Sequence, residues 1–137
     1  MVTKTRTVRC GALDARVRLR TAVAYLEVAE LVLDERRHDE YISVAAGLAV
    51  LAGIAAADSI CCTRLGRLHR GEDHRGAASL LTEAVPDGKA LASRLLRLLD
   101  VKDEAHYGVI GVAPRKGRDA IKWARQLVER ARDEVER

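Results

Sequence analysis

Apolar residues recur along this chain with the period of an α-helix in five separate stretches. The stretches cover about residues 14–35, 41–68, 73–83, 89–107 and 118–134. In the first of them, the positions that we assign to the core are Val17, Val23, Leu26, Val28, Leu31 and Leu33. The pattern predicts a helical protein with no strand longer than about three residues.

The second stretch is apolar on every side. No charged residue occurs from Ile42 to Ala57, which predicts a central helix buried by its neighbours. This run ends at Asp58 and is too short to span a bilayer, so we expect no membrane association. A carboxylate at the end of an uncharged run needs a partner, and we expect Asp58 to pair with an arginine or with His74.

Turn-forming residues separate the helical stretches. They occur at 71–74, at Pro86-Asp87-Gly88 and over 108–117. Short connections favour antiparallel neighbouring helices. The fold class predicted is all-α, a compact up-and-down bundle of four to five helices, in one domain over residues 13–137 after an arm of residues 1–12.

The basic charge of the chain is concentrated at its start. The formal net charge is +4, and residues 1–20 hold six basic side chains against one acidic side chain. A basic arm attracts polyanions, and nucleic acid in particular, through the release of counterions. A solvated arm without a partner is the simpler alternative.

The three cysteines are Cys10, Cys61 and Cys62, and their spacing does not match a metal site. We interpret the adjacent Cys61 and Cys62 as small apolar residues of a helix in a reducing compartment. The basic start of the chain lacks the apolar stretch of a signal peptide, which favours a cytoplasmic protein. No metal and no cofactor are expected.

Three segments in this order carry a family resemblance. Gly-Glu-Asp-His at 71–74 is followed by Leu-Leu-Arg-Leu-Leu at 95–99 and by Lys-Asp-Glu-Ala-His-Tyr-Gly at 102–108. Over about residues 14–134, the chain resembles the HEPN domain (higher eukaryotes and prokaryotes nucleotide-binding). The resemblance implies a helical bundle that is typically dimeric. Many members are metal-independent ribonucleases or toxins, often encoded with a nucleotidyltransferase partner, and many others are inactive binding modules.

The active branch of that family carries an arginine followed, after four to six residues, by a histidine at the two-fold interface. Here Lys102 stands in place of the arginine, with three residues between it and His106. This spacing puts both side chains one helical turn apart. The resemblance implies that His106 takes a proton from a ribose hydroxyl, that Lys102 steadies the phosphate, and that Tyr107 positions the substrate. A lysine lacks the bidentate fork of arginine, so the chain departs from the family pattern at this residue.

These features leave three functions open. The leading one is a bacterial, cytoplasmic HEPN-like protein that binds RNA or a nucleotide, as a component of a toxin–antitoxin or defence system. The alternatives are a non-catalytic helical module that binds a protein, and a metal-independent endoribonuclease that uses His106 and Lys102. The residues that we expect to contact RNA or a nucleotide are His74, Arg64, Arg67, Arg70 and Asp58. The resemblance and apolar stripes too wide for one small bundle also predict a homodimer.

Overall fold

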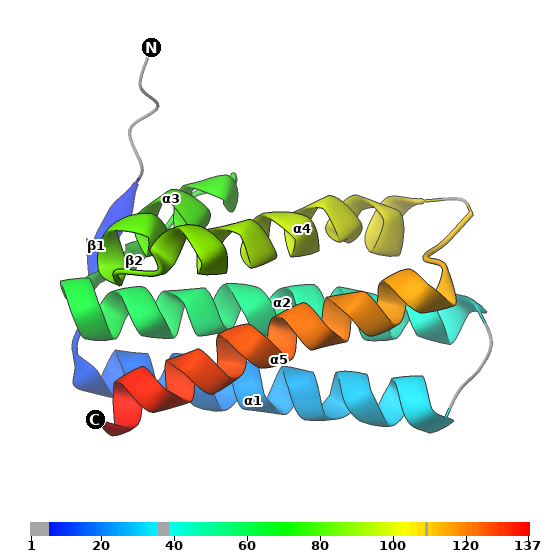
Figure 1. Ribbon diagram of the computed structural model, residues 1–137, viewed down its shortest axis with the longest axis horizontal. Coiled ribbons are helices and arrows are strands. Elements are labelled where there is room, and N and C mark those ends of the chain that lie inside the picture. Colours follow the sequence, from blue (N-terminus) through cyan, green and yellow to red (C-terminus); the bar gives the residue numbers. More distant parts are fainter. Residues whose placement is uncertain (1–5, 36–38, 109) are drawn as a thin grey trace, which may run out of the picture.

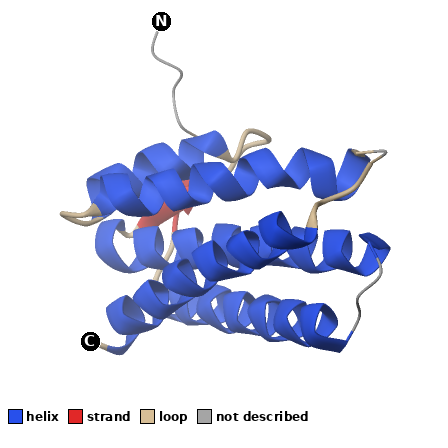
Figure 2. Ribbon diagram, turned by 45° about the vertical axis from the view of Figure 1, so that its right-hand side comes forward, coloured by secondary structure: helices blue, strands red, loops and turns tan. Residues whose placement is uncertain are grey.

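A computed structural model of the protein describes residues 6–35, 39–108 and 110–137. In chain order its elements are β1 (Thr7–Arg9), α1 (Ala12–Glu35), α2 (Asp39–Leu65), β2 (Arg67–His69), α3 (Arg75–Ala84), α4 (Gly88–Tyr107) and α5 (Pro114–Glu136). The long helices lie roughly side by side in a bundle, and the two short strands lie at one end of it (Figures 1 and 2). The predicted all-α bundle of four to five helices is confirmed.

The helix α2 forms the centre of the bundle, as its uncharged sequence predicts. Buried residues run from Ile42 to Cys62, and the other four helices pack around them. A methyl group on Gly53 would lie 2.5 Å from the Leu98 side chain, so the missing side chain brings α4 close. By length and mean hydropathy α2 could cross a membrane, and 83% of its most apolar window is buried inside the protein.

The segment predicted as a basic arm is part of the fold from Arg6 onwards. Residues Thr7 to Arg9 pair antiparallel with β2, with Val8 opposite Leu68. The next residue, Cys10, forms a disulfide with Cys62 across 5.8 Å between Cα atoms. The interpretation of Cys62 as a simple core residue is therefore wrong, whereas Cys61 is a buried free thiol. Residues 1–5, including Lys4, lie outside the described part of the chain.

Two predicted helix boundaries are wrong because of local backbone chemistry. The second helix ends at Leu65 rather than near Leu68, since Gly66 adopts a positive φ of 68° and its N–H bonds to the Cys62 carbonyl. The fifth helix begins at Pro114 rather than near Arg118, because proline suits the first helical position, where no N–H is needed. The predicted loop over 108–117 is correspondingly shorter.

The prediction of the α1 core face is only partly right. Leu26 is buried, but Val17, Val28 and Leu31 are exposed. The face that contacts the bundle is built from three alanines, Ala15, Ala22 and Ala29, together with Leu19 and Leu26. Alanine allows the backbones of α1 and α2 to approach closely, so the larger side chains are left on the opposite side.

Candidate functional site

A small pocket lies where the loop before α3 meets the second half of α4. Its volume is about 160 Å³, and its lining residues are Glu72, Asp73, His74, Arg75, Leu99, Lys102 and Asp103. The carboxylate of Asp73 accepts a hydrogen bond from the Arg75 N–H at 3.0 Å, which fixes the start of α3. The fold thus brings together two of the predicted site residues, His74 and Lys102, from segments that are separate in the sequence.

The surroundings of His74 favour its neutral form. Burial lowers the pKa of the imidazole, and the positive charge of Lys102 and the neighbouring His69 lower it further, against the opposing effect of Asp73. At neutral pH the ring is therefore available to accept a proton. The adjacent Arg75 forms an ion pair with Asp100 at 3.0 Å, so its charge is already partly compensated.

The structure places His106 away from this pocket. Its ring lies over Gly47 of α2, and a methyl group on that glycine would lie 2.9 Å from His106 Cε1. His106 and Lys102 are one turn apart on α4, but only Lys102 lines the pocket with His74. Tyr107 is the last residue of α4, and its side chain lies outside the part of the chain that the structure describes.

Asp58 has the partner that its position in the sequence demands. The carboxylate is buried and lies 2.9 Å from the Arg18 guanidinium, which also donates through Nε at 3.1 Å. Burial raises the pKa of Asp58, and the charge and hydrogen bond of Arg18 counteract only part of that effect. The predicted pairing with an arginine is confirmed, and this ion pair joins α2 to α1.

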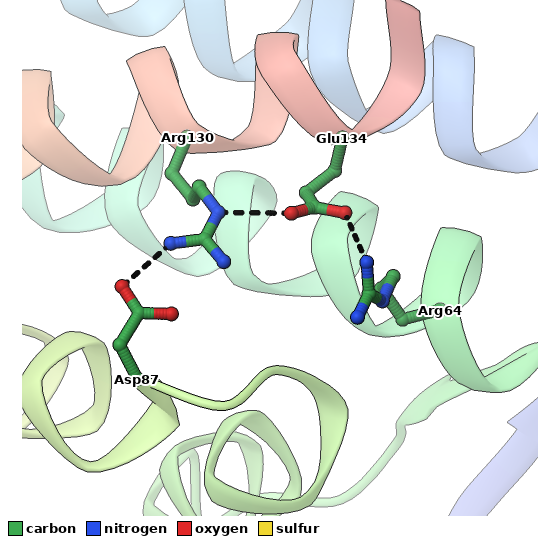
Figure 3. A network of polar contacts seen from close by, with 4 residues as sticks. All are labelled: Arg64, Asp87, Arg130 and Glu134. Atoms are coloured by element: carbon green, nitrogen blue, oxygen red, sulfur yellow. Dashed lines mark hydrogen bonds and ion pairs between the residues drawn. The ribbon is translucent and has the colours of Figure 1, made fainter. Parts of the chain in front are cut away.

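Of the three arginines predicted to contact a ligand, Arg64 is paired with a buried carboxylate inside the fold. Arg64 binds the buried Glu134 at 3.1 Å, and Arg130 links the same carboxylate to Asp87 (Figure 3). Burial opposes ionisation of Glu134, but the hydrogen bond from Arg130 and the charge of Arg64 outweigh it and lower the pKa.

The other two arginines of that set lie at the end of the bundle that carries the strands. The Arg67 guanidinium nitrogen Nη2 lies 3.6 Å from the carboxylate oxygen Oε1 of Glu83 in α3. Arg70 is exposed and forms no ion pair with any described residue, and its backbone N–H bonds to the Arg6 carbonyl. Of the predicted arginines, Arg70 is the one left available to a ligand.

A buried histidine lies at this end of the bundle, at a position that was not predicted from the sequence. The His69 ring is buried between β2 and α3, and neither of its nitrogens has a hydrogen-bond partner among the described residues. Gly76 leaves the space that the ring fills, since a methyl group there would overlap it. A strand of only three residues has too short an alternation to predict such a position.

Comparison with known proteins gives no family assignment. No protein-family model matches the chain, and no curated protein matches it in sequence. The described residues also contain no group of three or more side chains that could hold a metal ion.

Proposed function

We propose that this protein is a HEPN-like module of a toxin–antitoxin or defence system that binds RNA or a nucleotide. The observation that carries the proposal is a group of four cations, unpaired among the described residues, near the strands and the His74 pocket. Arg6, Arg9, Arg70 and Lys102 form no ion pair within the described chain, and they gather around β1, β2 and the His74 pocket. Positive side chains that the fold does not neutralise are the groups with which a protein binds phosphates.

The pocket and the strands would hold different parts of such a ligand. Glu72, Asp73 and Asp103 line the same pocket, and their carboxylates repel a phosphate. A phosphate is therefore bound favourably only where it lies beside Lys102 and His74. The strands offer Arg6 and Arg9 on an exposed surface. This arrangement favours one phosphate in the pocket and further backbone phosphates along the strands.

Binding should depend on the lysine of the pocket. We expect Lys102→Gln to weaken binding of a short single-stranded RNA, or of a nucleoside triphosphate, by about tenfold, because it removes a charge-assisted hydrogen bond. Fluorescence anisotropy at fixed salt measures the change. Lys122→Gln, at an exposed position of α5, is the matched control and should leave binding unchanged. Equal affinities of the wild type and Lys102→Gln would place the ligand elsewhere.

The affinity should also rise as the pH falls. A bound phosphate stabilises the protonated form of His74, whose pKa is below its ordinary value of 6.5 in the free protein. Binding therefore takes up a proton, and the affinity increases as the pH falls from neutral towards the free pKa. His74→Gln should remove this part of the pH dependence while the affinity at neutral pH changes little. A wild type with no pH dependence in this range would contradict a phosphate beside His74.

The remaining functions are outcomes of the same assays. Cleavage of the RNA in the presence of a chelator, lost in His106→Ala and preserved in Lys102→Arg, would support the endoribonuclease. A protein that binds neither RNA nor nucleotide would instead support the protein-binding module, with a nucleotidyltransferase-type protein as the partner to test. Both variants should fold normally, since neither residue belongs to the buried core.

A further inference from the structure

The helix α1 has a second apolar stripe, on the side that faces away from the bundle. Its residues Leu13, Val17, Val28 and Leu31 are 68%, 45%, 47% and 61% exposed. Their spacing places them on one side of the helix, opposite the buried face that contains Ala22. The stripe extends for about 27 Å along the helix axis at 1.5 Å per residue. Figures 1 and 2 show α1 at the edge of the bundle.

Charged residues border this stripe in an ordered way. Arg16 and Arg20 lie on one flank in the first half of the helix, and Glu27 and Asp34 lie on the same flank in the second half. All four are exposed, and none of them forms an ion pair within the described part of the chain. The flank is therefore basic at one end and acidic at the other.

We infer that this face of α1 binds a second copy of the same chain, with the two α1 helices antiparallel around a two-fold axis. In that arrangement Leu13 packs against Leu31 of the second copy, and Val17 packs against Val28. A two-fold axis of this kind also brings the same flank of both helices together in opposite directions. The basic half of one helix then lies along the acidic half of the other.

Charge selects the antiparallel arrangement over the parallel one. Antiparallel packing puts Arg20 within about one turn of Glu27 of the second copy, whereas parallel packing would place arginines opposite arginines. The surface is self-complementary in both shape and charge, which an isologous dimer requires. The inference concerns α1 alone and is independent of the proposed phosphate site.

The oligomeric state in solution tests this interface. Sedimentation equilibrium of the full chain should show a dimer at tens of micromolar, and Val28→Glu with Leu31→Glu should give a monomer with an unchanged circular dichroism spectrum. The matched control is Val44→Glu, which changes a 51% exposed valine of α2 and should leave the dimer intact. A monomeric wild type at hundreds of micromolar would overturn the inference, as would a dimer that only Val44→Glu disrupts.

A charge exchange tests the orientation of the two helices. A variant with Arg16→Glu and Arg20→Glu should be monomeric, and so should a variant with Glu27→Arg and Asp34→Arg. In an equimolar mixture of the two variants, each flank is uniformly charged, acidic in one protein and basic in the other. We therefore expect a heterodimer, detected by native mass spectrometry. Two variants that each remain homodimers and do not exchange would show that these flanks do not meet.

Discussion

Replacing Arg18 by methionine should lower the free energy of unfolding by about 3–5 kcal/mol at neutral pH, because it leaves a buried charge without its partner. Asp58 is buried among the residues of α2, and Arg18 is the cation that compensates it. Methionine keeps most of the volume of the arginine stem, so the loss reports mainly on the charge. Urea unfolding followed by circular dichroism measures it.

The same pair makes stability depend on pH in a defined direction. Burial raises the pKa of Asp58 in the folded protein above the ordinary 3.8, so its contribution to stability is fully present below that value. The contribution is lost as the pH rises through the folded pKa. In Arg18→Met the folded pKa should be higher still, and lowering the pH towards 3.8 should recover much of the lost stability.

Two variants control this experiment. Asp58→Asn removes the titrating group and should remove this part of the pH dependence, with Arg18 remaining partly solvated. Arg132→Met changes an exposed arginine of α5 and should lower the free energy of unfolding only slightly. If Arg18→Met were no less stable than Arg132→Met at neutral pH, Asp58 would be neutral in the folded protein and would not need the cation.

Reducing the Cys10–Cys62 disulfide should lower the free energy of unfolding by an amount similar to that expected for Arg18→Met. Cys10 and Cys62 are 52 positions apart, and closing a loop of that length restricts the unfolded chain by about 4 kcal/mol. Guanidinium unfolding with and without a phosphine reductant should therefore show a large shift in the midpoint for the wild type. Cys10→Ser should be less stable from the start and should not respond to the reductant.

Cys61 provides the control for that measurement. It is a buried free thiol next to Cys62, and Cys61→Ala should keep the response to reductant. If the reductant did not change the guanidinium unfolding midpoint of the wild type, the disulfide would have no structural role. Trapping the thiols by alkylation in intact cells also tests the cytoplasmic location, because structural disulfides are rare in a reducing cytosol.

Most of the fold could be predicted because α2 has an unambiguous sequence. An uncharged run from Ile42 to Ala57 can be satisfied only by burial on all sides, and the four other helices bury it. An ion pair of Asp58 could likewise be predicted, since a carboxylate at the end of such a run cannot remain unpaired. The identity of the partner could not be predicted, because Arg18 is one of nineteen arginines and is forty positions away in the chain.

The errors have physical causes that a single sequence conceals. The core face of α1 was assigned by side-chain size, whereas the close contact with α2 selects Ala15, Ala22 and Ala29. Three-residue strands carry too little alternation to be detected, so β1 was assigned to the arm. The pocket of the candidate site could not be predicted either. It brings His74 next to Lys102 only because α4 packs against α3, and no local sequence pattern predicts that packing.

The disulfide end of the bundle is also where the two ends of the fold meet. Val135, near the end of α5, lines the same hollow as Cys10, Gly11 and Cys62, and β1 and the end of α5 lie at the same end of Figure 1. A short linker could therefore join the end of α5 to β1, and the chain could be reopened between Gly108 and Ala113. Such a circular permutant would keep every helix and the Cys10–Cys62 bridge. Its new ends would lie at the opposite end of the bundle, leaving the strands and their arginines clear of any fused tag.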